Sequence, residues 1–118
     1  MEKEELQRRT KQFALAVIRF DGKLPRSRAG MVIGNQLLRA ATSVGANYRA
    51  ACRARSRADF ISKIGIVEEE ADECAYWLEL IQEGNLLPAE EITPLLQEAR
   101  ELTAIFTASG RTAKSNRK

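Results

Sequence analysis

The strongest constraint on the fold is a row of apolar residues between positions 60 and 81 of the 118-residue chain. Its members are separated alternately by four and three residues, a spacing typical of helices that pack at about 20° in a bundle. No segment alternates with period two over a useful length, so the pattern predicts an all-α protein. The row consists of Phe60, Ile64, Val67, Ala71, Cys74, Leu78 and Ile81.

Start and stop signals set the bounds of the first two helices. The first is expected over about residues 4–20, ending at Asp21-Gly22, where the glycine should adopt the left-handed conformation that ends many helices. The second is expected to begin after Ser27, whose hydroxyl suits an N-cap, and to run to about Arg53. Its many glycine and alanine residues indicate that another helix approaches it closely.

The third helix is expected to form a hairpin with the second. Ser56-x-x-Asp59 is a start that resembles a capping box. Gly45 lies 11 residues before Ser56 and Gly65 lies 9 after it, so a short turn places the two glycines at nearly the same height. The sequence therefore predicts a close crossing of the two helices at Gly45 and Gly65.

The fourth helix is expected to follow Pro88, after one preliminary turn, with Thr93 as its cap and Pro94 at its first helical position. It should end at Gly110, and residues 111–118 are expected to form a disordered basic tail because they carry too few apolar side chains to fold. The predicted architecture is one domain, an up-down-up-down four-helix bundle over residues 1–110.

The charge of the chain is distributed unevenly. Residues 1–57 contain 13 Lys or Arg against 4 Asp or Glu, whereas residues 58–118 contain 6 against 12. Such asymmetry is typical either of a nucleic-acid surface or of self-assembly through faces of opposite charge. We favour self-assembly slightly, so a homo-oligomer is expected.

The acidic run at residues 68–73 raises the question of a metal site. Ferritin-like di-iron bundles use Glu-x-x-His pairs on inward faces, and the chain has no histidine. Consecutive glutamates also fan around a helix and cannot converge on one ion. We therefore expect no metal and a solvated or salt-bridged face, with Arg39 near Asp72 and Glu73 by the hairpin arithmetic.

Few residues are available for catalysis. Without histidine, the Ser–His and Cys–His nucleophile systems are excluded, and the glycines lack the pattern of a phosphate-binding loop. Cys52 and Cys74 lie among alanines and are expected to be small buried hydrophobes. We therefore predict a protein that is not an enzyme and has no cofactor. No apolar run approaches the roughly 18 residues of a membrane span and the start is not a signal peptide, which favours the cytoplasm.

Four arginines lie where the second helix meets the third. Arg49, Arg53 and Arg57 recur every four residues, and Arg55 joins them in the turn. The guanidinium group is a planar fork that suits either phosphate or carboxylate. The arginines therefore either contact nucleic-acid phosphates or form ion pairs with the carboxylates of the third helix or of a neighbouring subunit. No base-stacking motif accompanies them, so sequence-specific recognition is not implied.

Further candidate packing or interface residues lie on the two middle helices. Tyr48 belongs to the apolar row of the second helix. Asn47 is either buried, where its amide would need partners and would fix the helix register, or exposed. Tyr76 and Trp77 are adjacent, so at about 100° per residue at least one of the two leaves the apolar seam. That aromatic ring is expected to point toward a partner helix, a groove or another chain.

These residues resemble the four-helix bundle protein family that is also called the 23S rRNA intervening-sequence protein (S23-like) family. Its members pair a Ser-[Val/Ile]-x-Ala-Asn segment with a Ser-x-x-[Asp/Glu]-Phe start and a later carboxylate-rich helix. Many members carry a glutamate soon after the asparagine, where this chain has Arg49-Ala50-Ala51, so any role of that acid does not transfer. The matching positions are Gln36, Leu37, Arg39, Ala40, Ala41, Ser43, Val44, Ala46, Asn47, Ser56, Asp59, Phe60, Glu70 and Leu78.

The resemblance covers about residues 10–107 and implies a bacterial, cytoplasmic, non-enzymatic protein. It also implies a four-helix protomer that assembles into a homo-oligomer, with a pentamer as the best-known form. Accessory proteins of diversity-generating retroelements resemble this fold and work with reverse transcriptase and nucleic acid. The leading hypothesis is a homo-oligomeric helical scaffold that binds RNA, DNA or a ribonucleoprotein through the four arginines. The alternative is a protein-only adaptor whose charged faces serve self-assembly and protein partners.

Overall fold

The computed structural model describes residues 1–116 and consists of four helices joined by short loops. Within those residues there is no β-strand, so the predicted all-α class is confirmed. The helices are α1 (Lys3–Asp21), α2 (Arg28–Ala51), α3 (Arg57–Glu83) and α4 (Ala89–Ser115).

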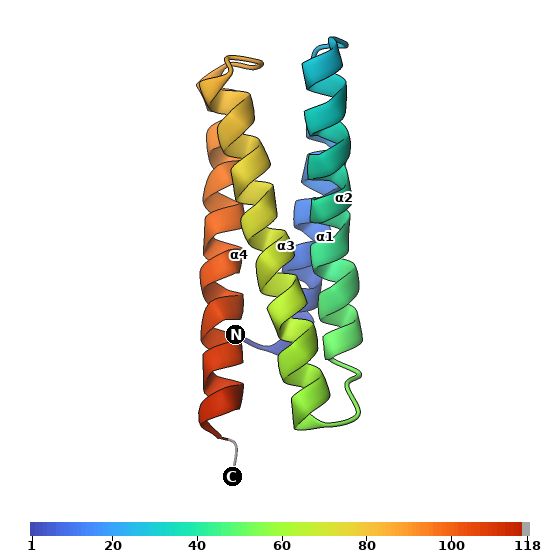
Figure 1. The fold of residues 1–118 in the computed structure, drawn as a ribbon, viewed down its shortest axis with the longest axis vertical. Helices are drawn as coiled ribbons and strands as arrows, with labels where there is room; N and C mark the ends of the chain where they lie inside the picture. The colour runs from blue at the N-terminus through green and yellow to red at the C-terminus, as the bar shows by residue number, and fades with distance from the viewer. Residues whose placement is uncertain (117–118) are drawn as a thin grey trace.

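The molecule measures 51 × 22 × 20 Å along its principal axes. The four helices lie side by side along the longest of these axes (Figure 1). Each helix packs against the next one in the chain, and the direction of the chain alternates from helix to helix in Figure 1. Helix α1 also contacts α4, more sparsely, and so closes the bundle. Three ion pairs bridge this last junction within residues 1–116. Arg9 Nε lies 2.6 Å from Glu98 Oε2, Arg9 Nη2 lies 2.7 Å from Glu101 Oε1, and Lys23 Nζ, just after α1, lies 2.8 Å from Glu91 Oε2.

The core consists of the apolar rows that the helical spacing predicts. All seven residues of the predicted α3 row are buried except Phe60, which is half-buried. Thr10, a polar member of the α1 row, is fully buried, and its hydroxyl donates a 2.9 Å hydrogen bond to the carbonyl of Leu6. This bond satisfies the hydroxyl without a partner from another helix. The α1 row consists of Leu6, Thr10, Phe13, Val17 and Phe20.

Both predicted serine N-caps are present. Ser27 Oγ accepts a 3.1 Å hydrogen bond from the Gly30 amide, and Ser56 Oγ accepts one of 3.0 Å from the Asp59 amide. The carboxylate of Asp59 accepts from the amide of Arg55 at 3.3 Å, one residue before the cap. The caps satisfy amides at the helix starts that have no partner within the helix, and so fix where α2 and α3 begin.

The prediction of a left-handed glycine after α1 is wrong. Gly22 has a φ of −65°, because the chain continues in a tight right-handed turn in which the Lys23 amide bonds to the Phe20 carbonyl. The left-handed conformation occurs instead at Asn85, with a φ of 56°, in the loop after α3. Asparagine is one of the few residues other than glycine that adopts it readily.

Helix α4 follows Pro88 as predicted, but the prediction of Thr93 as its cap and Pro94 as its first residue is wrong. The helix begins at Ala89, and Thr93 lies inside it, where its hydroxyl donates a 2.9 Å hydrogen bond to the Ala89 carbonyl. Pro94 therefore occupies an interior position and leaves the Glu90 carbonyl without its usual donor. Both Pro94 and Glu90 are exposed, so solvent can satisfy that carbonyl.

The prediction that folding ends at Gly110 is wrong as well, because α4 continues to Ser115. Gly110 is buried, and a Cβ atom built there would lie 3.5 Å from Cγ2 of Ile64. Gly110 therefore lies at the contact between α4 and α3, where a Cβ atom would be at an ordinary van der Waals distance. Of the predicted disordered tail, residues 111–115 are helical, and residues 117–118 lie outside the described residues.

Candidate functional site

A chain of hydrogen bonds joins α2 to α3 on the surface of the bundle. The side-chain amide of Asn47 donates to the backbone carbonyl of Ser43 at 2.9 Å and to its hydroxyl at 2.7 Å. The Ser43 hydroxyl donates to Glu70 Oε2 at 2.9 Å. Asn47 is half-buried, so it lies between the two states expected from the sequence, and its amide is satisfied within its own helix.

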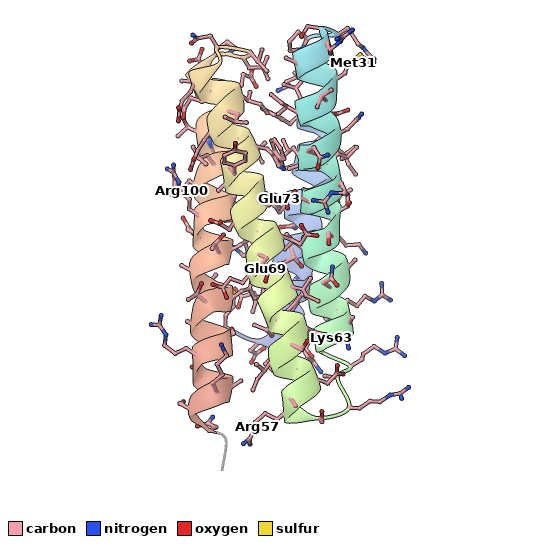
Figure 2. All side chains as sticks on the ribbon, in the orientation of Figure 1. Met31, Arg57, Lys63, Glu69, Glu73 and Arg100 are labelled. Atoms are coloured by element: carbon pink, nitrogen blue, oxygen red, sulfur yellow. The ribbon has the colours of Figure 1, made fainter. Side chains whose placement is uncertain are left out.

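Arg39 extends the network along the seam between the two helices. Its Nη1 lies 3.1 Å from Glu70 Oε2, and its Nη2 pairs with Glu73. The indole Nε1 of Trp77 donates to the same Glu73 carboxylate at 3.1 Å. The hydrogen bonds that Arg39 donates to Glu70 first, and then to Glu73, raise the pKa of Arg39 above its ordinary value. The guanidinium group thus holds two α3 carboxylates against α2, and Figure 2 shows Glu73 between the two helices.

The predicted approach of Arg39 to Glu73 is confirmed, but the approach to Asp72 is wrong. Asp72 is exposed and forms no ion pair within residues 1–116. The cause is the rotation of about 100° per residue, which turns position 72 away from α2 while positions 70 and 73 face it. Glu70, one of the positions that match the family pattern, takes the place predicted for Asp72.

The four arginines expected to form the basic patch are all exposed at one end of the bundle. Arg49 is in the last turn of α2, Arg53 and Arg55 are in the loop, and Arg57 begins α3. None of them pairs with a carboxylate within residues 1–116. The guanidinium of Arg57 donates to the backbone carbonyl of Asn116, and Figure 2 shows Arg57 at this end of the molecule. Of the α3 acids, Asp59 accepts from the backbone amide of Arg55, but its ion pair is with Lys63 and not with one of the four guanidinium groups.

Two further cations at this end were missed by sequence reasoning. Arg111 and Lys114 are exposed in the last turns of α4, whose C-terminal end lies at the same end of the bundle as the α2–α3 loop (Figure 1). The sequence pattern places them in a disordered tail, because Ser109-Gly110 is typical of a helix end and the residues that follow carry few apolar side chains. A signal was present, since the apolar spacing of α4 continues through Gly110 to the half-buried Ala113.

The predicted crossing at Gly45 and Gly65 is wrong. A Cβ atom at Gly45 would lie 3.4 Å from Oγ1 of Thr10, so this glycine faces α1. A Cβ atom at Gly65 would meet nothing within 4 Å. The two residues lie at similar heights, but each helix is rotated so that its glycine points away from the other helix. Gly65 therefore lies on the outer surface of α3.

The three aromatic candidates differ in position. Tyr48 is buried, with its ring 5.2 Å from that of Phe106 on α4, and burial raises the pKa of its hydroxyl. Tyr48 is therefore a core residue. Trp77 is half-buried, whereas Tyr76 is 52% exposed. This confirms that one of the adjacent aromatics leaves the seam.

Two further properties concern the described part of the chain. Residues 1–116 contain no group of three Cys, Asp or Glu side chains placed to hold a metal ion. Over the same residues, no helix combines the length and the apolar character required to cross a membrane.

The fold and these surfaces define a small helical-bundle protein with a polar network between α2 and α3 and an arginine-rich end. The chain belongs to the 23S rRNA-intervening sequence protein family, whose model matches residues 2–108. The resemblance stated from the sequence is therefore confirmed. Among curated proteins, no sequence matches the chain.

A solved structure from Bacteroides thetaiotaomicron VPI-5482 has the same fold. It is described as a protein with unknown function from the S23 ribosomal protein family. Its sequence is 31% identical to this one, the TM-score is 0.85, and the match covers 94% of this chain and 99% of that chain.

Proposed function

We propose that the protein is a non-enzymatic, cytoplasmic scaffold that binds RNA, DNA or a ribonucleoprotein through its arginine-rich end. In this proposal the up-down-up-down bundle is the protomer of a homo-oligomer, a pentamer. The observation that carries the proposal is that Arg49, Arg53, Arg55 and Arg57 are exposed together with no carboxylate partner within residues 1–116.

Unpaired arginines at one end suit a polyanionic ligand. Each guanidinium presents donors that match phosphate oxygens, and each phosphate contact releases condensed counterions. Arg111 and Lys114 add positive charge at the same end. The acid next to the cluster is Asp59, whose carboxylate accepts from the Arg55 amide at 3.3 Å and pairs with Lys63. The name of the family refers to an intervening sequence of 23S rRNA, which supports RNA as the ligand class. Because no stacking platform accompanies the arginines, binding is proposed to be independent of sequence.

The test is the salt dependence of binding to a single-stranded RNA. The logarithm of the association constant decreases with the logarithm of the salt concentration. For the Arg53→Ala/Arg57→Ala variant this dependence should be less steep by about 1.4, because each lost contact to a single strand removes about 0.7 from the slope. The matched control is Arg26→Ala/Arg28→Ala, which removes two exposed arginines near the opposite end and should leave the slope unchanged. An intact oligomer with no measurable binding at about 50 mM salt would eliminate the nucleic-acid function.

The alternative, a protein-only adaptor, has one observation in its favour. Glu69 and Asp72 are exposed on α3 and form no ion pair within the described part of the chain, so they are free to form ion pairs with the arginines of an adjacent copy. In that case the Arg53→Ala/Arg57→Ala variant should dissociate or melt earlier, and the native protein should bind nucleic acid little. Native gel electrophoresis of the same variants distinguishes this outcome from the loss of RNA binding.

A further inference from the structure

The outer surfaces of α1 and α2 form a groove of about 570 Å³. Its floor is made of small side chains, so the backbone of another helix could approach it closely. Three of these residues belong to α2 and one to α1. The floor consists of Ala14, Thr42, Gly45 and Ala46.

The rim of this groove is basic. Arg8 and Lys11 of α1 and Arg49 of α2 line it, together with a single acid, Glu4. All four side chains are exposed, and none forms an ion pair within residues 1–116. The groove therefore favours an occupant that carries negative charge.

An acidic surface of suitable shape lies on the same protein. The outer side of α3 presents Gly65, where an added Cβ would meet no atom within 4 Å. Around it are Ile66, 42% exposed, and Tyr76, 52% exposed. Glu69 and Asp72 are exposed there without an ion-pair partner in residues 1–116; Glu69 is labelled on α3 in Figure 2. We call these five residues the acidic α3 face.

The groove and the acidic α3 face lie at the same height along the bundle. The Ser43–Glu70 hydrogen bond places these two residues level with each other, and α2 and α3 run in opposite directions. Counting from that bond at an equal rise per residue, positions 42–49 of α2 lie level with about positions 64–71 of α3. These ranges contain the α2 part of the groove and most of the acidic α3 face.

We propose that the groove receives the acidic α3 face of a second copy of this chain. This inference deepens the homo-oligomer of the proposed function and rests on it. The contact is heterologous, since two different surfaces meet, and each copy still has one of each free. Because the two surfaces lie at one height, a pure rotation about an axis parallel to the bundle can relate the copies. The repeated contact closes into a ring when the rotation angle divides a full turn evenly, whereas surfaces at different heights would generate a filament.

Charge reversal tests this pairing. Arg8→Glu/Lys11→Glu makes the groove acidic, and Glu69→Lys/Asp72→Lys makes the α3 face basic. Each double variant should run as a helical monomer by light scattering at tens of micromolar. All four substitutions in one chain should restore the oligomer, because opposite charges again meet. A mixture of the two double variants should also associate, since each groove then matches the other variant's face. A five-membered ring cannot alternate the two variants without one like-charged contact, so the mixture should form complexes larger than a monomer but not the native pentamer.

The control is Arg26→Glu/Arg28→Glu, which reverses two exposed arginines near the other end and should keep the native mass. Gly65→Leu provides a second test that does not alter charge. The protomer has room for this side chain, but a docked helix does not, so a helical monomer is expected; Ala108→Leu on the exposed side of α4 is its control.

The outcomes separate this inference from the proposed function. A native protein that is a monomer at tens of micromolar overturns both the ring and the proposed homo-oligomer. A native oligomer whose mass is unchanged in both charge-reversed variants and in Gly65→Leu overturns only the proposed pairing. Because none of these variants alters Arg53, Arg55 or Arg57, RNA binding can be measured independently on the same proteins.

Discussion

The hydroxyl of Ser43 donates a 2.9 Å hydrogen bond to the carboxylate of Glu70, and this bond sets the register between α2 and α3. Arg39 holds the same carboxylate from one turn earlier on α2, at 3.1 Å. Two donors from one helix on one carboxylate leave little freedom for the helices to slide past each other. The stability of this arrangement can be measured by removing the weaker donor.

Replacing Ser43 with alanine should lower the free energy of unfolding by about 1 kcal/mol, the net value of a typical hydrogen bond. The change should exceed the gain of a few tenths of a kcal/mol from the better helix propensity of alanine. The measurement is urea unfolding followed by circular dichroism. Thr42→Ala is the control, because Thr42 is exposed and its hydroxyl bonds only within its own helix. Equal stability of the two variants would show that the bond to Glu70 contributes nothing.

Acid should weaken the start of α3. The hydrogen bond from Lys63, and then that from the Arg55 amide, hold the pKa of Asp59 below its ordinary value of 3.8. A carboxyl with a lowered folded-state pKa stabilises the fold above its unfolded pKa, and this contribution is lost as the pH falls through the folded pKa. The unfolding midpoint of the native chain should therefore drop more steeply below about pH 4 than that of Asp59→Asn. Parallel curves for the two proteins from neutral pH to strong acid would contradict the assignment.

The two cysteines should differ in reactivity. Cys74 is fully buried and burial raises the pKa of its thiol, so little thiolate is available for attack. Cys52 is half-buried at the end of α2. A disulfide reagent should label one thiol per native chain and two in urea, and Cys52→Ser should abolish the native labelling. Rapid native labelling of Cys52→Ser would show that the bundle opens around Cys74.

Two glycines of similar height should respond oppositely to larger side chains. Gly45→Leu should cost about 1–3 kcal/mol, because the added side chain is forced against Thr10 at the α1–α2 contact. Gly65→Ala should stabilise the protomer by about 0.5–1 kcal/mol, since it meets open space and improves helix propensity. Both are measured by urea unfolding at one low protein concentration, because assembly adds a concentration-dependent contribution. Destabilisation by Gly65→Ala would mean that α3 is packed more tightly there than the structure shows.

The elements that the sequence predicted well are those decided by local patterns. The buried row of α1 and the serine caps of α2 and α3 follow from periodicity and from side chains that bond to nearby amides. Glycine was the recurrent source of error. Gly45 and Gly65 could be placed at one height by counting residues, but counting does not give the rotation of each helix about its own axis. Gly110 could be a stop or a close contact, and only the presence of Ile64 on another helix distinguishes the two.

The candidate site could be predicted only in part, again because residue counting does not give the rotation of each helix about its own axis. The four arginines lie within nine residues of each other in the sequence, around one predicted turn, so their position at one end of the bundle could be predicted. The network around Glu70 joins residues that are 27 or more positions apart, and its partners depend on which side of α3 each carboxylate occupies. Arg111 and Lys114 joined the basic end only because α4 continues past its buried glycine.

The uneven attachment of α1 has a consequence for the kinetics of opening. This helix packs on α2 along one side but only sparsely on α4, where the Arg9–Glu98 and Lys23–Glu91 pairs bridge the junction. Helices with few neighbours open at a lower free energy than the whole domain, so the amides of α1 should exchange with deuterium before those of α3, which is flanked closely by α2 and α4. Since α1 also forms one wall of the basic groove, a chain docked there would slow that exchange. Amide protection in α1 would thus rise with protein concentration, while protection in the α3 core would change little.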